Sequence, residues 1–79
     1  MKRNHFDIIA EILQVAKKGA KKTHIMYKCN LSYRQTNKLL NFSLETGLLR
    51  IGNSYHTTEK GLRFLQTYQT LKLLLNPKN

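Results

Sequence analysis

The residues with most chemical potential lie in the stretch NLSYRQTNKLLNFSLETGLLR, residues 30–50. The pattern predicts a helix over about residues 33–46, opened by a Ser32–Gln35 capping box and ended by Gly47. Its first two turns carry hydrogen-bonding side chains and no acid: Ser32, Tyr33, Arg34, Gln35, Asn37 and Lys38. Donors without counter-charges suit the base edges and phosphates of a DNA duplex, where a carboxylate would be repelled.

The helical period separates this segment into two sides. The predicted buried side carries Thr36, Leu40 and Leu44, with Leu39 at its flank, and the opposite side carries Arg34, Lys38 and Asn41. For Ser32 and Gln35, helix capping alone explains the residues as well as DNA contact does. Arg34 and Lys38 have no acid four residues away, so an ordinary solvated face explains them less well than an interface does.

The charge of the whole chain favours a polyanionic partner. Fourteen Lys and Arg oppose four Asp and Glu among 79 residues, which gives a net charge of +10 and an isoelectric point near 10.1. Nucleic acid is the first candidate and an anionic membrane the second, while a charge that serves only solubility explains so few acids less well. With 41% hydrophobic residues the chain is predicted to form a single globular domain over residues 1–79.

The flanking segments predict the elements that position this helix. Apolar residues recur at helical spacing from His5 to Lys18, before Gly19, and Thr23 is predicted to cap a brief second helix. Residues 48–51 and 54–57 read as strands joined by a two-residue turn at Gly52-Asn53, and a last helix spans about residues 58–75. The predicted fold is mainly α with a small β-hairpin: a helix-turn-helix, a wing and an extended C-terminal helix.

The predicted DNA-binding residues come from the basic connector, the second and third helices and the wing. For the wing, a purely structural hairpin remains about as good an explanation. The full set is Lys21, Lys22, Thr23, Lys28, Ser32, Tyr33, Arg34, Gln35, Asn37, Lys38, Arg50, Asn53, Ser54 and His56.

The last helix carries more apolar residues than one side can bury. Leu62 and Leu65 are expected to pack on the core of the same chain. A second stripe at heptad-like spacing predicts a homodimer interface, formed by Phe64, Tyr68, Leu71 and Leu75. The alternative is that the first helix folds over this stripe.

Three segments also carry a family resemblance: DIIAEILQVAKKGAKKTHIMYKCNLSYRQTNKLL, ETGLL and YHTTEKGLRFL. They resemble the winged helix-turn-helix family of short archaeal transcriptional regulators, including those of archaeal viruses and plasmids. The resemblance implies duplex DNA binding, with helix 33–46 as the reader and the hairpin as the wing, and many such proteins dimerise through the last helix. Thr36 departs from the family, which usually has an aliphatic residue at this position.

Other functions find little support in the residues. No nucleophile–base pair is visible, so an enzyme is not predicted, and Asp7 and Glu11 are expected to be solvated acids on a helix face. Cys29 and His24 project from different faces, so neither a metal site nor any cofactor is predicted, and Cys29 is expected to be a small buried hydrophobe.

The sequence also predicts where the protein is located and to which class its function belongs. A single cysteine, no signal peptide and no apolar run of membrane-spanning length predict a cytoplasmic protein, in the host cytoplasm if the gene is viral. The preferred function is sequence-specific transcriptional regulation. The alternatives are an architectural, weakly specific DNA-coating protein and a protein-interaction adaptor, although an adaptor has no need of this charge.

Overall fold

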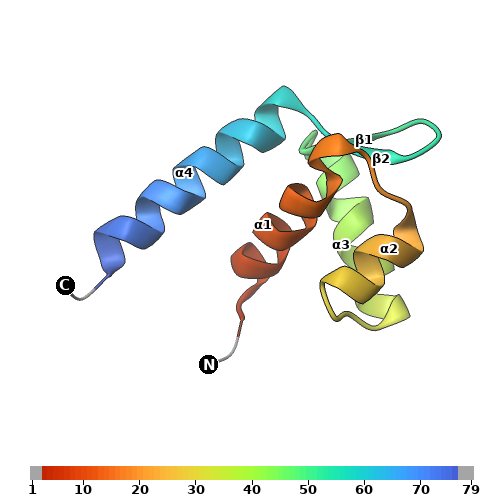
Figure 1. Cartoon of the computed structure of the whole chain (residues 1–79), viewed down its shortest axis with the longest axis horizontal. Helices are drawn as coiled ribbons and strands as arrows, with labels where there is room; N and C mark the ends of the chain where they lie inside the picture. The colour runs from red at the N-terminus through yellow and green to blue at the C-terminus, as the bar shows by residue number, and fades with distance from the viewer. Residues whose placement is uncertain (1–2, 77–79) are drawn as a thin grey trace.

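The computed structural model describes residues 3–76, which form four α-helices and a two-stranded antiparallel hairpin (Figure 1). In chain order the elements are α1 (His5–Val15), the 3-10 turn η1 (Ala16–Lys18), α2 (Lys22–Lys28), α3 (Tyr33–Glu45), β1 (Leu49–Ile51), β2 (Tyr55–Thr57) and α4 (Glu59–Leu75). The helix-turn-helix followed by a wing and a long last helix is the predicted fold, which is confirmed.

The core lies where α1, α2 and α3 meet. Ile12 and Leu13 of α1, Ile25 of α2 and Leu40 of α3 are at most 1% exposed, and each comes from a predicted apolar face. Thr36 is also fully buried, and its hydroxyl donates to the carbonyl oxygen of Ser32 at 2.8 Å. The Thr36 hydroxyl, which an aliphatic residue would lack, is therefore hydrogen-bonded to the backbone at the start of α3.

The two acids of α1 have structural partners, so the expectation of free, solvated carboxylates was wrong. Asp7 forms a capping box with Asn4 and also accepts a hydrogen bond from the hydroxyl of Tyr68 in α4. Glu11 pairs with Arg3 at 2.5 Å, and the same guanidinium donates to the carbonyl oxygen of Cys29 at 2.7 Å. These contacts join α1 to α4 on one side and to the end of α2 on the other.

The start of α2 corrects one prediction, because Thr23 is not its N-cap. The capping position is Lys21, with extended backbone and no side-chain cap, and Thr23 lies inside the first turn. The reason is tertiary: Ala20 pairs with Tyr55 of β2 through two backbone hydrogen bonds of 2.9 and 3.0 Å. This pairing ends the extended connector directly before Lys22 and outweighs the capping tendency of Thr23.

The hairpin loop is also longer than the predicted two-residue turn. Ile51 pairs with Tyr55, so Gly52, Asn53 and Ser54 all lie in the loop, and Ser54 is not part of a strand. Inside the loop the Gly52 amide donates to the Ser54 carbonyl oxygen at 3.1 Å, which turns that carbonyl inward and away from a strand pairing.

The last helix begins as predicted, with Thr58 as its cap, and lies beside α1 on the side away from α3 (Figure 1). Its first turn fits closely under the hairpin, since a Cβ on Gly61 would collide with the carbonyl oxygen of Leu48. Leu65 is buried, as expected. Leu62 is 42% exposed and does not pack in the core, which corrects the prediction, because α4 turns Phe64, Leu65 and Tyr68 toward the core instead.

Candidate nucleic-acid interface

The turn between α2 and α3 is built around Asn30, whose φ of 57° lies in the left-handed region. The Leu31 amide donates to the Met26 carbonyl oxygen at 2.9 Å and the Asn30 amide donates to Tyr27 at 3.2 Å. This is the Schellman arrangement, in which asparagine can replace glycine. It ends α2 abruptly and brings α3 against it after four residues, which is helix-turn-helix geometry.

The N-terminus of α3 carries the predicted capping box. The Gln35 amide donates to the Ser32 hydroxyl, and the Ser32 amide donates to the Gln35 side-chain oxygen, each at 3.1 Å. Both side chains are therefore engaged in capping, although both remain exposed. The box makes the start of α3 rigid, so the side chains that follow are presented from a fixed backbone.

From Tyr33 to Asn41 the outward face of α3 is basic, polar and free of acids, and Glu45 at the end of the helix is the one acid on this face. Arg34, Lys38 and Asn41 are exposed, as the helical period predicts, and Tyr33 is 64% exposed beside them. Within residues 3–76 the only salt bridge joins Arg3 to Glu11, so Arg34 and Lys38 have no acidic partner in the described structure. Their positive charge is available to an external anion.

The connector lysines contact the elements on either side of them. The Lys21 amine donates to the Asn53 carbonyl oxygen at the wing tip at 2.6 Å. The Lys22 amine donates to the Asn37 side-chain oxygen at 2.5 Å and lies 5.3 Å from the centre of the Tyr33 ring. Two residues predicted as phosphate contacts thus also connect the wing and α3 into a single surface.

The wing is anchored on the connector. Arg50 and Asn53 are exposed, whereas Ser54 and His56 are half-buried. The His56 ring packs on Gly19, whose φ is 97° and where a Cβ would lie 2.7 Å from Nε2. His56 is therefore the least accessible of the predicted wing contacts.

The other predicted contacts, Thr23 and Lys28, are exposed on α2. Two residues outside the predicted set share this accessibility: Asn41 on the outward face of α3, and Tyr27 of α2, which is 79% exposed. The helical period could have identified Tyr27, because it projects opposite the buried Ile25.

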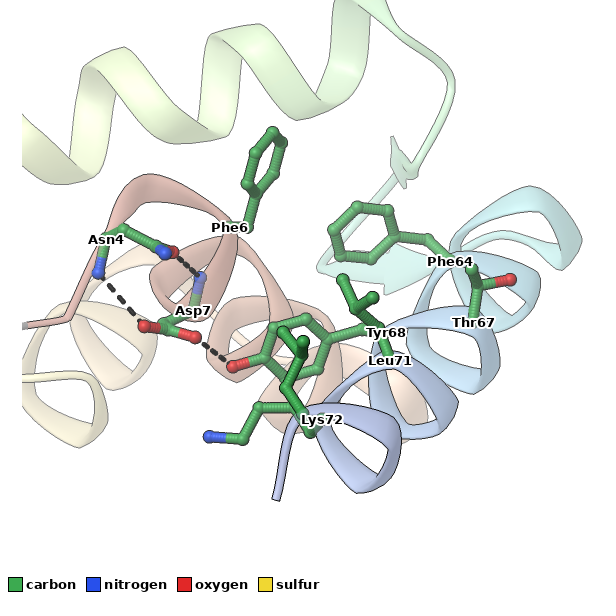
Figure 2. Close-up of a pocket in the computed structure, with 9 residues that line it drawn as sticks. Asn4, Phe6, Asp7, Phe64, Thr67, Tyr68, Leu71 and Lys72 are labelled. Atoms are coloured by element: carbon green, nitrogen blue, oxygen red, sulfur yellow. Dashed lines mark hydrogen bonds between the residues drawn. The ribbon is translucent and has the colours of Figure 1, made fainter. Parts of the chain in front are cut away.

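A groove of about 330 Å³ lies between the N-terminus of α1 and the second half of α4 (Figure 2). Tyr68 extends across its floor and donates to Asp7, and the Phe64 and Tyr68 rings are 6.3 Å apart and nearly parallel. The remaining lining residues are Phe6, Leu71 and Leu75, which are apolar, and Asn4, Thr67 and Lys72.

The predicted dimer stripe is divided by this packing. Phe64 and Tyr68 are partly buried against the core, so α1 does cover this part of the stripe, while Leu71 and Leu75 are 51% and 72% exposed.

The hydrogen bond from Tyr68 and the backbone amide of Asn4 lower the pKa of Asp7. The same hydrogen bond, together with burial, raises the pKa of Tyr68 to about 12.

No group of three or more His, Cys, Asp and Glu side chains within residues 3–76 could hold a metal ion. None of the helices in this part of the chain has the length and apolar character needed to span a membrane. Cys29 is 1% exposed in the core, as expected, and burial raises the pKa of its thiol to about 11.

Comparison with known proteins agrees with this geometry. A family model described as winged helix-turn-helix matches residues 2–76. An uncharacterized protein of Methanocaldococcus jannaschii is 33% identical over 79 residues, an alignment that covers 98% of this chain and 81% of the archaeal protein. The winged helix-turn-helix is a DNA-binding, non-enzymatic kind of domain. From its element order and this match over nearly its whole length, the chain belongs to the winged helix-turn-helix family.

Proposed function

We propose that this protein is a sequence-specific transcriptional regulator that reads double-stranded DNA with α3 in the major groove. The wing then lies along the neighbouring backbone or minor groove. The observation that carries the proposal is the outward face of α3, where Arg34, Lys38 and Asn41 are exposed after the capping box and neither cation has a salt-bridge partner among the described residues. Such donors can read base edges, and the surrounding lysines can hold phosphates.

The magnitude of the electrostatic contribution follows from the cations around this face: Lys21, Lys22, Lys28, Arg34, Lys38 and Arg50. If roughly four to six of them neutralise phosphates, log K falls against log salt with a slope of about −4 to −5. Between 50 and 200 mM salt, affinity for any duplex should then fall on the order of 100- to 1,000-fold.

The experiment is fluorescence anisotropy with duplexes enriched from a random library, measured across this range of salt. Arg34→Ala should reduce discrimination at one base pair by ~1–3 kcal/mol if its guanidinium binds guanine in a bidentate manner. Lys28→Ala is the matched control, because an exposed lysine at the end of α2 should contribute affinity to all sequences alike. Binding that does not change with salt would refute DNA binding, and enrichment of no motif would favour an architectural protein.

The proposal includes a homodimer formed through α4. Its support is the exposed apolar end of the helix, where Leu71, Leu73, Leu74 and Leu75 are 51–77% exposed. A second copy of α4 could cover part of this surface and relate two α3 helices by a two-fold axis. They could then enter successive major grooves about 34 Å apart.

Sedimentation at micromolar concentration tests this dimer. Wild type should exceed the mass of one 9.3 kDa chain, and Leu71→Glu with Leu75→Glu should return it to that mass. Leu62→Glu is the matched control, because Leu62 is also an exposed leucine of α4 but lies opposite the stripe. A wild-type protein that remains monomeric as its concentration rises, or equal loss of the dimer in both variants, would contradict the proposal.

A further inference from the structure

The seam between α2 and α3 holds a polar cluster of Lys22, Tyr33 and Asn37. The Lys22 amine donates to the Asn37 amide oxygen at 2.5 Å, and its position 5.3 Å from the Tyr33 ring centre allows a cation–π attraction. Lys22 and Asn37 are both half-buried, although they lie 15 residues apart in the chain. The contact therefore joins the first turn of α2 to α3, whose outward face exposes Arg34 and Lys38.

The chemistry of this contact determines which end of the Asn37 amide remains available. A lysine ammonium has three donors and no acceptor, so the amide atom that faces it must be the oxygen. The amide nitrogen, which only donates, is then the end left for an external ligand. Asn37 lies one helical turn from Arg34 and Asn41, so this donor borders the outward face of α3.

We propose that Lys22 is a specificity-determining positioning residue, which makes Asn37 a donor toward DNA and directs it to guanine in preference to adenine. The inference rests on the proposed function. An asparagine reads adenine by accepting from N6 and donating to N7 at the same time, and the oxygen that would accept from N6 is here turned toward the Lys22 ammonium. Guanine presents two acceptors, O6 and N7, in the major groove, so a donor alone can bind it.

The test compares motifs enriched from a random duplex library by four proteins. Asn37→Ala identifies the base pair that Asn37 contacts, because its preference there disappears. Wild type should prefer guanine at that position, whereas Lys22→Met should change the preference to adenine by roughly 5- to 150-fold, the discrimination of a good bidentate pair. Methionine retains the stem and a favourable contact with Tyr33 but has no donor. Lys21→Met is the matched control, because it removes an equal charge from the neighbouring residue and should retain the preference for guanine.

A second measurement needs no DNA. In the free protein, Lys22→Met should displace the side-chain amide resonances of Asn37 in a ¹⁵N spectrum, and Lys21→Met should not. Lys22→Leu provides a second variant if the methionine protein is poorly folded, which the same spectrum reveals. Unchanged Asn37 resonances would overturn the inference whatever the DNA result.

The remaining outcomes separate this inference from the proposed function. If Lys22→Met weakens binding but enriches the wild-type motif, Lys22 is only a charge near the phosphates, and the inference is overturned while sequence-specific binding stands. If wild type enriches no motif at all, the proposed function fails. The specificity role of Lys22 then fails with it, even where the spectra show the contact to Asn37.

Discussion

Replacement of serine by alanine should change the free energy of unfolding in opposite directions at Ser43 of α3 and at Ser32, the N-cap of this helix. The Ser43 hydroxyl is fully buried and has no hydrogen-bond partner among the described residues. An unpaired buried hydroxyl costs about 1–3 kcal/mol, and alanine has a helix propensity better than serine by about 0.5 kcal/mol. Removal of one oxygen leaves a space of roughly 10 Å³, which costs about 0.2 kcal/mol. Ser43→Ala should therefore raise the free energy of unfolding by about 1–3 kcal/mol.

Ser32→Ala is the matched control, because it removes the same atom from a hydroxyl that accepts a hydrogen bond from the Gln35 amide. Loss of this cap should lower the free energy of unfolding by about 1 kcal/mol. Urea denaturation followed by circular dichroism at one protein concentration measures both, with an unchanged m value. In thermal unfolding, each kcal/mol should shift Tm by about 4–8 °C. If Ser43→Ala leaves stability unchanged or lowers it, the hydroxyl has a partner and the reasoning is refuted.

Three further predictions follow from single contacts. Gly61→Ala should lower the free energy of unfolding by about 1–3 kcal/mol, because the added Cβ would collide with the carbonyl oxygen of Leu48. Gly52→Ala should change this free energy little, because a Cβ at Gly52 would meet no atom within 4 Å. Urea denaturation compares the two variants. The Tyr68 hydroxyl lowers the pKa of Asp7, so this carboxylate stabilises the fold above pH ~4 and loses that effect as pH falls through the lowered pKa. Tyr68→Phe should consequently flatten the acid side of the stability–pH curve measured by urea denaturation. Burial raises the pKa of Cys29 to about 11, so iodoacetamide at neutral pH should modify it only in urea, as mass spectrometry can detect.

The features that sequence predicted well are local ones. Ser32 and Gln35 lie three residues apart, and their reciprocal hydrogen bonds depend only on that spacing. Gly47, with a φ of 80°, ends α3 because the Leu48 amide must reach back to the Ser43 carbonyl oxygen. Each of these choices is made within one helical turn, so a sequence pattern contains the necessary information.

The features that sequence missed depend on partners distant in the chain. Thr23 has the right chemistry for a cap, but the pairing of Ala20 with Tyr55 decides where α2 begins. Nothing in the spacing of Lys22 and Asn37 indicates that the amine of one contacts the amide of the other. Both contacts exist only because the hairpin and α3 pack beside the connector, which periodicity cannot specify.

A contact between residues distant in the chain also limits how α4 could bind a second copy of the protein. As a stripe of heptad spacing, Phe64, Tyr68, Leu71 and Leu75 would meet a partner along most of the helix, but Tyr68 turns toward Asp7 of the same chain, 61 residues away. The exposed part of the stripe is then limited to the last two turns, and the helix rises only about 1.5 Å per residue. So short a leucine contact is small for a stable dimer. A second copy would therefore have to use the groove as well, since its mostly apolar wall extends the contact beyond α4 to Phe6, which is 63% exposed at the start of α1.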